Sequence, residues 1–431
     1  MVTLLEDLRF RGLVHQMTDP ALADHLVGDS LTAYSGFDPT ADSLHVGHLL
    51  QLCNLRRLQL AGHRPIAVAG GATGLIGDPG GKSEERTPLS AEELRRNTEG
   101  IHAQLRSFLE LDSGGGGTNA VLVDNSEWLG SLSLLDFLRE VGKHFTVGQM
   151  TAKDSVRTRL ARPEQGISYT EFSYMLLQAY DFLHLFDAFG CRLQLGGSDQ
   201  WGNITMGIDL IRRLRREEAW GLTTPLVVKA DGTKFGKTET GTVWLDPTRT
   251  SPYQLYQFFL RTEDEVVGTY LRYFTFLPHD AITDLDRATV EHPEHREAQR
   301  ELARQVCTLV HGPLETERAE QAAAALFGEG GEGIAGLDER SLLEVFAEAP
   351  STSLARGRLD DGGVSLVDLL AETGILPSKS RARATVEQGG VYVNNRRERD
   401  AERAIHAGDL IAGRYVVLRR GKRDYHLVSF A

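Results

Sequence analysis

Two histidines three residues apart, His45 and His48, lie where a predicted strand gives way to a predicted helix. In an open α/β sheet, ligands lie at the carboxyl ends of the strands, and the first turn of the next helix presents free N–H groups to an anion. Gly47 between the two imidazoles permits close approach, so both rings could hydrogen-bond a phosphate chain. Two other interpretations are a helix cap with incidental histidines, and a metal pair, for which no third ligand with suitable spacing follows.

A glycine-rich run over residues 70–82, which ends in Lys82 and is followed by Arg86, is a second candidate phosphate site. Glycine at this density lets the backbone approach a ligand closely, and the two cations suit a phosphate. The spacing matches neither a Walker A loop nor a dinucleotide-binding fingerprint, because Ile76 occupies the place of the first Walker glycine. The run alone is equally typical of a surface turn.

Two further groups of polar residues are tied to predicted helices. Tyr174, Gln178 and Asp181 fall on one face of an otherwise apolar helical run, which makes either a solvent face or a polar pocket with a carboxylate at its floor. Asp199 lies at a strand-to-helix junction, where a carboxylate commonly meets ribose hydroxyls; a simple helix cap is the alternative.

Lysine is rare in this chain, which makes the loop over residues 229–238 informative. The chain has eight lysines and 39 arginines, yet Lys229, Lys234 and Lys237 crowd this one loop. A compact, flexible ammonium suits a phosphate in transfer, whereas the arginine fork suits static recognition. The loop is therefore predicted to act on a phosphate in transfer; chance clustering of the lysines is the alternative.

Alternating strands and helices must position these groups between residues 31 and 229. The predicted strands are 31–36, 65–70, 120–124, 192–196 and 225–229. The predicted helices are 46–61, 91–111, 132–141, 170–189 and 201–216. This alternation is typical of an α/β fold with a parallel sheet covered by helices on both faces.

The rest of the chain changes character. Helical patterns without strands continue over 251–327, two glycine-rich interruptions follow, and 364–428 mixes short helical patterns with apolar alternation. The predicted domains are a sheet domain at 1–224, a loop region at 225–249, a helical domain at 250–327, a linker at 328–363 and a small α+β domain at 364–431.

The charge is unevenly distributed. The 431 residues carry 47 Lys plus Arg against 60 Asp plus Glu, a net −13, which argues against a protein that coats nucleic acid. Residues 364–431, however, hold 12 basic and eight acidic residues, a net +4. An acidic body with a small basic tail indicates one local contact with a polyanion.

Composition excludes several other classes. The hydrophobic content of 41% allows a sizeable core, and the charge-free run 65–77 is too short and glycine-rich to span a membrane. The amino terminus does not read as a secretion signal. Three scattered cysteines favour a reduced, cytoplasmic setting and disfavour a disulfide scaffold or a structural metal.

Together these segments resemble a class I aminoacyl-tRNA synthetase of the bacterial tyrosyl type, over residues 31–428. His45-Val-Gly-His48 is similar to the HIGH motif of that class, and Lys234-Phe-Gly-Lys-Thr238 resembles its KMSKS loop, with Phe235 and Gly236 in place of the commoner Met and Ser. The tail, with Ser378-Lys-Ser-Arg-Ala-Arg383 and Gly389-Gly-Val-Tyr-Val-Asn394, resembles an S4 RNA-binding domain.

The resemblance implies a Rossmann-like catalytic domain, ATP as substrate with Mg²⁺ on the nucleotide, tRNA(Tyr) as partner, and a homodimer. It implies that tyrosine is bound by Tyr34, Gly36, Asp78, Tyr174, Gln178 and Asp181. It implies that ATP is bound by Asp38, Thr40, His45, Gly47, His48, Gly197, Asp199, Gln200 and Lys237. Catalysis would then fall to Thr40, His45, His48, Lys82, Arg86, Lys234 and Lys237.

Three other functions compete with this interpretation. A tryptophanyl enzyme shares the fold and both motifs, but Tyr34 and Asp181 placed for a phenol speak against it. An inactive, synthetase-like RNA-binding protein would have no physical need for the histidines, Asp78, Asp199 or the loop lysines. A nucleotidyltransferase that activates another small acid would share the ATP site and differ only at the phenol pocket.

Overall fold

The computed structural model describes residues 2–28, 30–78, 89–111, 118–161, 166–233, 235–238, 241–327, 332–347, 349–360, 362–421 and 424–431. The chain divides into two compact units. The first contains Met1–Thr250 and Thr262–Gln305, and the second contains Ser251–Arg261 and Val306–Ala431. Among the helices of these described ranges, none is long and apolar enough to cross a membrane.

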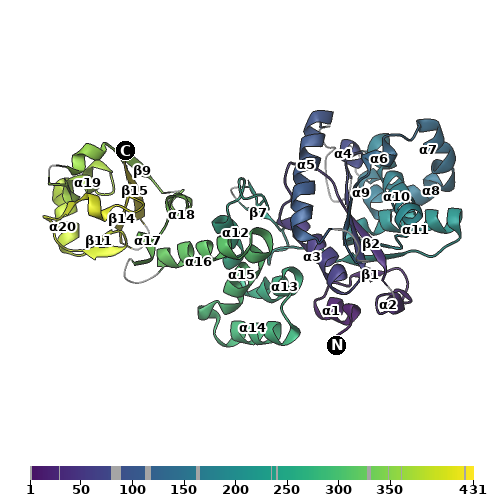
Figure 1. Ribbon diagram of the computed structural model, residues 1–431, viewed down its shortest axis with the longest axis horizontal. Coiled ribbons are helices and arrows are strands. Elements are labelled where there is room, and N and C mark those ends of the chain that lie inside the picture. The colour runs from purple at the N-terminus through teal and green to yellow at the C-terminus, as the bar shows by residue number, and fades with distance from the viewer. Residues whose placement is uncertain are drawn as a thin grey trace. The chain divides into compact units, whose positions relative to one another are not determined.

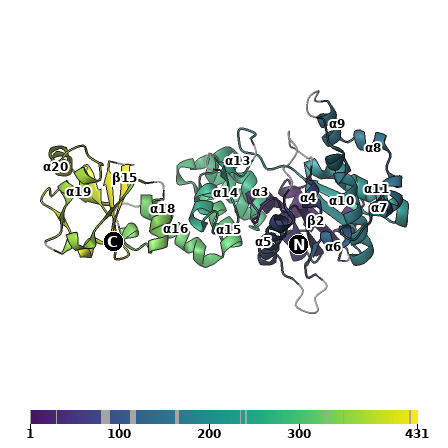
Figure 2. The same cartoon turned by 90° about the horizontal axis from the view of Figure 1, so that it is seen from above.

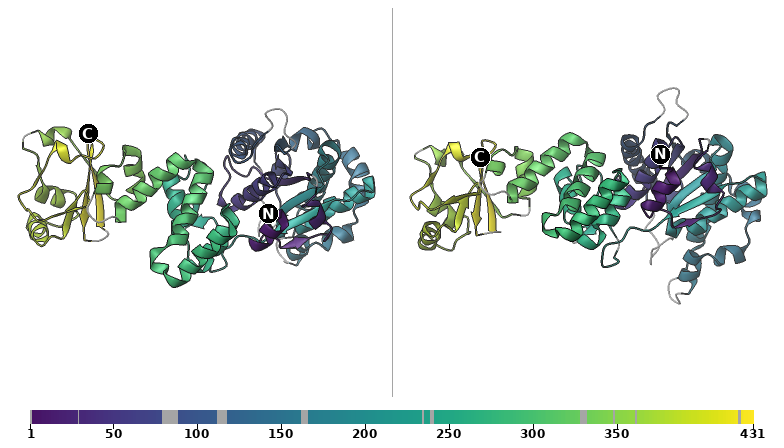
Figure 3. Two further views of the ribbon diagram at one scale, coloured as in Figure 1. Left: turned by 60° about the horizontal axis from the view of Figure 1, so that its bottom comes forward. Right: turned by 90° about the horizontal axis from the view of Figure 1, so that it is seen from below.

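The first unit is built on a six-stranded sheet with the order β1-β6-β5-β2-β3-β4. Its strands are β1 (Gln16–Met17), β2 (Thr32–Phe37), β3 (Arg64–Ala69), β4 (Val121–Asp124), β5 (Leu193–Gly197) and β6 (Trp220–Thr224). All neighbours pair in parallel except β1, which runs antiparallel to β6 at the edge. Figure 3 shows the purple strands from the start of the chain lying among the teal strands from around residue 200. The predicted parallel sheet is confirmed.

Helices cover both faces of this sheet, as the sequence predicts. Figure 1 shows α3 (Val46–Leu60) and α5 (Ala91–Phe108) on one side, and α10 (Tyr169–Phe189) and α11 (Trp201–Arg215) on the other. The long helix α10 begins at Ser168, whose hydroxyl accepts a hydrogen bond from the N–H of Glu171, and it ends at Gly190 in the left-handed conformation. Its apolar side packs against the strands in a core that includes Tyr34 and Phe182.

Shorter elements complete the first unit. They are α1 (Leu4–Phe10), α2 (Leu22–His25), α4 (Thr73–Ile76), α6 (Ser126–Leu129), α7 (Leu134–Glu140), η1 (Gly142–His144), α8 (Val147–Thr151), α9 (Asp154–Leu160), η2 (Ser198–Gln200), β7 (Lys237–Thr238), β8 (Gly241–Thr242), α13 (Asp264–Phe274), α14 (His279–Glu291) and η3 (Pro293–His295). Helix α15 (Glu297–His311) runs from the first unit into the second.

One predicted strand is wrong. The apolar run 225–229 forms no named strand, and the sixth strand is β6, which ends at Thr224. Pro225 has no N–H to donate to a sheet ladder, so the strand stops before it. Leu226 and Val228 are 52% and 45% exposed, whereas every residue of β6 is buried. The sequence pattern did not indicate β6, because two glutamates lie shortly before Trp220 and a glycine follows it.

The second unit combines helices with a small sheet domain. Its elements are α12 (Pro252–Leu260), α16 (Pro313–Phe327), α17 (Glu332–Ala335), α18 (Glu339–Val345), β9 (Ser351–Leu354), η4 (Arg356–Leu359), β10 (Val364–Ser365), α19 (Leu366–Glu372), α20 (Lys379–Glu387), β11 (Val391–Val393), β12 (Arg396–Glu398), β13 (Ala404–Ile405), η5 (Ala407–Asp409), β14 (Tyr415–Arg420) and β15 (Asp424–Phe430). Five strands pair in the order β12-β11-β14-β15-β9.

The range predicted as a linker, residues 328–363, contains part of this sheet. Strand β9 pairs in parallel with β15, from Ser351 opposite Leu427 to Leu354 opposite Phe430. Its alternating, half-exposed side chains are those of an edge strand, which carries too little apolar signal to stand out in the sequence. The backbone of the C-terminal sheet therefore begins before residue 364.

Candidate active site

Strand β2 places Tyr34, its third residue, in a buried position that is a candidate tyrosine pocket. Tyr34 is 2% exposed, and its ring lies 5.3 Å from that of Phe182 in the core of the first unit. Its hydroxyl is buried and has no hydrogen-bond partner among the described residues. Burial, followed by the charge of Asp181, raises the pKa of this hydroxyl well above its ordinary value. Tyr34 therefore keeps its proton and holds an unused donor in an apolar setting.

Asp181 is the carboxylate that faces this pocket from α10. It is 4% exposed, and its two oxygens accept hydrogen bonds from Asn125 Nδ2 at 3.0 Å and Trp128 Nε1 at 2.7 Å. Burial raises the pKa of Asp181 to about 7, although the two donors act in the opposite direction. The predicted pair of Tyr34 and Asp181 thus lies together, with opposite hydrogen-bonding character.

A chain of hydrogen bonds connects Asp181 to the mouth of the site. Asn125 also donates to Thr73 Oγ1, which donates to Asp38 Oδ1, and Asp38 Oδ2 accepts from the hydroxyl of Tyr174; each distance is 3.0 Å. Gly70 leaves room for this carboxylate, because a Cβ there would lie 2.3 Å from Asp38 Oδ1. The two predicted residues Asp38 and Tyr174 are therefore held in place by residues that the sequence analysis did not single out.

A second polar group lies where α10 meets the start of α11. Gln200 Nε2 donates to Asp78 at 2.7 Å, and Asn203 Nδ2 donates to Gln178 Oε1 at 3.0 Å. Asn203 also donates to Gln200 Oε1 at 3.2 Å, which closes the group. Asp199 stands next to it, after β5, and accepts from Gln200 Nε2 at 3.3 Å. The structure therefore brings together Asp78 and Gln178, which the resemblance assigned to tyrosine, and Gln200, which it assigned to ATP.

The two histidines form a stacked pair at the start of α3. Their ring centroids are 3.9 Å apart, and the ring planes differ by 23°. His45 Nδ1 accepts from the N–H of Gly47, and His48 Nδ1 accepts from the N–H of His45. A ring that accepts through Nδ1 carries its proton on Nε2, so each is a neutral Nε2 donor suited to a phosphate oxygen. A Cβ on Gly47 would lie 2.7 Å from the His45 ring, so only glycine fits between them.

Backbone pairing brings the lysine-rich loop to this same helix start. Val46 N–H donates to the carbonyl of Val243 at 3.1 Å, and Leu245 N–H donates to the carbonyl of Leu44 at 2.8 Å. Gly236, at φ +83°, packs so closely on Val46 that a Cβ would lie 2.8 Å from its Cγ2. The two sequence motifs, almost 190 residues apart, are therefore neighbours in space.

The remaining predicted residues are three near the ends of β2 and β5 and four cations of the glycine-rich and lysine-rich loops. Gly36 and Thr40 are exposed, and nothing lies within 4 Å of the place a Gly36 side chain would take, so this backbone is accessible to a ligand. A Cβ on Gly197 would lie 2.5 Å from Asp199 Oδ1, which explains glycine at the end of β5. Lys82, Arg86 and Lys234 lie outside the described residues, and so does the side chain of Lys237.

The residues that sequence reasoning missed are Thr73, Asn125, Trp128 and Asn203. Asn125 follows β4 directly, so its place at the carboxyl end of a parallel strand was a readable signal. Trp128 and Asn203 gave no such signal, because each acts through its contact with a predicted residue rather than through its place in a motif.

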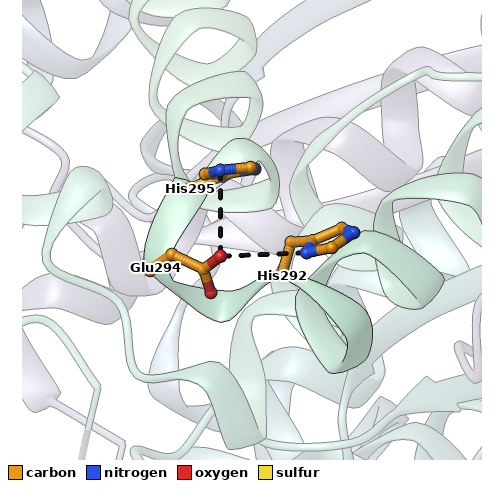
Figure 4. Close-up of side chains that lie close together, drawn as sticks. All are labelled: His292, Glu294 and His295. Carbon is orange, nitrogen blue, oxygen red and sulfur yellow. Dashed lines mark ion pairs between the residues drawn. The ribbon is translucent and has the colours of Figure 1, made fainter.

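A separate group of potential metal ligands lies at the end of α14. Figure 4 shows His292, Glu294 and His295, with Glu294 Oε1 3.7 Å from His292 Nδ1 and 3.8 Å from His295 Nε2. All three side chains are more than half exposed, and none belongs to the site described above. This group carries no part of the candidate active site.

Known proteins match the whole chain. Residues 28–328 match the family described as tRNA synthetases class I (W and Y), and residues 342–428 match the tyrosine–tRNA ligase SYY-like C-terminal domain. The tyrosine–tRNA ligase of Roseiflexus castenholzii is 54% identical over 428 residues, which cover 99% of both chains. The chain belongs to the tyrosine–tRNA ligase family. The C-terminal match and the full-length relatives decide for tyrosine against the tryptophanyl alternative, since the first family description covers both.

Two further comparisons place the family more closely. The tyrosine–tRNA ligase of Geobacillus stearothermophilus is 50% identical and covers 99% of this chain and 100% of its own. The solved structure of a C-terminally truncated mitochondrial tyrosyl-tRNA synthetase from Aspergillus nidulans has a TM-score of 0.68 and 32% identity, and the match covers 76% of this chain and 95% of that one. The predicted family, fold and enzyme class are confirmed, and with them the class I use of ATP.

Proposed function

We propose that this member of the tyrosine–tRNA ligase family selects tyrosine through the pair of Tyr34 and Asp181. The observation that carries the proposal is the buried Tyr34 hydroxyl, which has no partner among the described residues, beside a buried carboxylate. The phenol hydroxyl of tyrosine accepts from Tyr34 and donates to Asp181. Phenylalanine offers neither, so it leaves both groups desolvated without a partner.

The ammonium group of the substrate lies among Asp78, Tyr174 and Gln178 in this proposal. Two hydrogen bonds support this position: the Tyr174 hydroxyl donates to Asp38, and Gln200 donates to Asp78. They hold two carboxylates near the expected ammonium group, more than one helical turn along α10 from Asp181. A cation there is favoured by both charges. The amino acid is thus held at its phenol and at its ammonium group, which fixes the position of the carboxylate on the same α-carbon.

ATP binds across the start of α3 and the end of β5 in this proposal. His45 and His48 donate through Nε2 to the phosphates, and Asp199 accepts from the ribose hydroxyls. Further nucleotide contacts are assigned to Asp38, Thr40, Gly47, Gly197 and Gln200, whereas Gly36 is assigned to tyrosine. Two neutral donors at a helix start attract an anion without competing for its bound metal, which suits a nucleotide that carries Mg²⁺ on its phosphates.

The reaction then needs positioning and charge stabilisation. The tyrosine carboxylate attacks the α-phosphate, pyrophosphate leaves, and the tyrosyl group passes to the terminal ribose of tRNA without a covalent bond to the enzyme. The cations Lys82, Arg86, Lys234 and Lys237 are assigned to the leaving pyrophosphate from their sequence motifs alone.

The test is amino-acid-dependent exchange of labelled pyrophosphate into ATP, with tyrosine, phenylalanine and tryptophan in parallel and no tRNA present. We expect exchange with tyrosine alone. Equal exchange with phenylalanine would remove the Tyr34–Asp181 pair as the selector. Silence from a folded sample that still binds tRNA would favour the inactive, RNA-binding alternative.

A homodimer in the cytoplasm completes the proposal. The support for the homodimer in the structure is three exposed apolar side chains: Leu134 and Leu135 on α7 and Val147 on α8 are 69%, 77% and 68% exposed. Large apolar side chains gathered on one surface are typical of a protein–protein interface. Sedimentation at micromolar concentration is expected to give a dimer, and substitution of Leu134 and Leu135 by serine is expected to give a monomer.

A further inference from the structure

The two histidines of the proposed nucleotide site lie in a run of four rings. His45 and His48 stack on each other, and each also meets an aromatic ring edge-on. The Phe37 ring lies 6.4 Å from that of His48, at 66°, and the Trp244 ring lies 6.1 Å from that of His45, at 61°. We call these residues the four-ring run. Each imidazole therefore contacts two rings, which restricts its rotation.

The two ends of the four-ring run come from different parts of the fold. Phe37 is 2% exposed and is the last residue of β2, so it belongs to the core of the sheet. Trp244 is half-buried and follows the lysine-rich loop. Figure 2 shows α3, whose first turn carries the histidines, between β2 and α13. The run therefore joins the sheet to the segment that follows the loop.

Backbone pairing ties Trp244 to the lysine-rich loop. Lys237 pairs with Thr242 in the hairpin of β7 and β8. Trp244 lies just after this hairpin and pairs with His45 in an isolated antiparallel bridge. One short stretch of backbone therefore sets both the backbone position of Lys237 and the position of the indole beside His45.

The lysine-rich loop is itself anchored on α13. Phe235 is 4% exposed, and its ring lies 4.9 Å from that of Tyr270 and 5.4 Å from that of Phe274. The Tyr270 hydroxyl donates to the carbonyl of Val228 at 2.8 Å, at the start of the loop. The loop is thus held on one helix near both of its ends, so the segment that carries Trp244 leaves it from a fixed point.

A cation covers one face of the indole. Arg249 lies over the Trp244 ring, with its guanidinium carbon 4.1 Å from the ring centre. Arg249 also pairs at 3.0 Å with Asp42, which lies shortly before His45 in the chain. The backbone N–H of Trp244 donates to Thr250 Oγ1 at 2.9 Å, which closes the turn that carries Arg249 back over the ring. The indole is thus held both by its own segment and by the segment before α3.

We propose that Trp244 is a positioning residue, which holds the Nε2 donor of His45 at a fixed place relative to the backbone of Lys237. This inference rests on the proposed function, in which His45 donates to the phosphates of ATP. A donor stabilises developing charge only when it is held in place beforehand, and a displacement of about 1 Å can lower the rate about 100-fold. An indole packed between Arg249 and His45 supplies that restraint, whereas a smaller aliphatic side chain would leave the imidazole free to rotate.

The test is a double-mutant cycle in the full chain. Its variants are Trp244→Leu, which removes the ring, His45→Ala, and the two together; Trp244→Phe keeps a ring and is the conservative variant. Trp220→Leu is the matched control, because the Trp220 indole also packs on an imidazole, 4.2 Å from that of His25, but at the amino end of β6. Thermal melting of each variant reports whether its fold is kept, and tyrosine-dependent pyrophosphate exchange gives kcat and KM.

We expect Trp244→Leu to lower kcat for exchange about tenfold, with the KM for tyrosine unchanged, and Trp244→Phe to recover most of the rate. In the His45→Ala background, Trp244→Leu should cost no more than about twofold, because the donor that it positions is already absent. Trp220→Leu should leave kcat within about twofold of the wild type, whatever its effect on the melting temperature.

A milder variant keeps the test decisive if Trp244→Leu does not fold. Arg249→Ala uncovers one face of the indole without changing the indole itself. It should lower kcat about threefold when His45 is present, as for the loss of one cation–π contact, and leave kcat unchanged in the His45→Ala background. An equal loss in both backgrounds would contradict the inference.

A second readout does not depend on activity. In protein with isotope-labelled histidine, the ring nitrogens of His45 are assigned by the loss of their magnetic resonance signals in His45→Ala, and they report the tautomer of the ring. We expect the wild type to show the form that accepts through Nδ1. Trp244→Leu should replace it by averaged signals, and Trp220→Leu should keep it.

Two results would overturn the inference: an equal loss of kcat from Trp244→Leu with and without His45, or unchanged His45 ring signals in Trp244→Leu. The first would mean that the indole only supports the fold. Absence of exchange from the wild type would count against the proposed function, while the histidine signals would still decide whether Trp244 holds His45.

Discussion

The proposed tyrosine pocket and the exposed arginines of the C-terminal domain use polar side chains in opposite ways. In the pocket, Asp181 is 4% exposed and both its oxygens accept hydrogen bonds, while the buried Tyr34 hydroxyl has no partner among the described residues. In the C-terminal domain, Arg397 and Arg399 are exposed. Burial makes each unmet group costly, so a pocket can recognise one hydroxyl. Salt screens an exposed charge, so exposed arginines would contribute to anion binding one by one, and less at higher salt.

The largest effect is expected from Asp181→Asn. An asparagine amide has one acceptor oxygen instead of two. It could not accept from Asn125, from Trp128 and from the phenol at the same time. We expect kcat/KM for tyrosine in pyrophosphate exchange to fall about 100- to 1,000-fold, because a hydrogen bond to a charged group and its pocket geometry are lost together.

The KM for ATP in the same assay is the control for this variant. It should stay within about twofold, since the histidine pair lies outside the Asp181 network. A similar loss of ATP affinity would mean that Asp181 supports the whole site rather than the binding of the phenol, and the contrast between the buried pocket and the exposed arginines would lose its basis.

The next effect is expected from His48→Ala. This change removes an Nε2 donor from the phosphate side of the site and should lower kcat for exchange about 100-fold, the usual size for one donor aimed at developing charge. Tyrosine affinity, measured by equilibrium dialysis, should not change. His48→Gln keeps a side-chain donor and should recover part of the rate; a loss of tyrosine binding in His48→Ala would contradict the separation of the two subsites.

The sequence indicated most of the site because its residues follow strand ends or repeat along a helix. His45, Asp199 and the polar stripe of α10 were all readable in this way. The supporting residues were not, since Trp128 and Asn203 matter through contacts that only the folded chain makes. The edge strand β9 was hidden for a similar reason: its polar residues are ordered by β15, about 75 residues later. A truncation meant to remove the C-terminal sheet must therefore begin before Ser351.

A smaller effect is expected from pH. The pKa of Asp181 is raised to about 7 in the empty pocket, so the carboxylate that accepts from the phenol is lost as the pH falls below 7. We expect kcat/KM for tyrosine to fall about tenfold per pH unit below that value, while tRNA affinity at fixed salt changes little, because arginine does not titrate there.

Stability should show the opposite trend for this group. Between its ordinary pKa of 3.8 and about 7, Asp181 binds a proton in the folded protein and not in the unfolded one. The folded state therefore loses stability from this group as the pH rises through that window. Urea unfolding at about pH 5 and pH 8 should show a larger decline in the wild type than in Asp181→Asn. Equal declines would place the pKa of Asp181 near its ordinary value.

The smallest effect is expected from Tyr34→Phe, and it has two parts. Without ligand, the variant should be more stable by about 1 kcal/mol, because it removes a buried hydroxyl that has no partner among the described residues. With ligand, kcat/KM for tyrosine should fall about five- to tenfold, as for one neutral hydrogen bond, while that for phenylalanine should not fall. Thermal melting and exchange assays measure the two parts. A stabilised variant with weaker tyrosine selection would show that the pocket keeps an unsatisfied donor because tyrosine satisfies it; a destabilised variant would mean that the hydroxyl already has a partner in the empty protein.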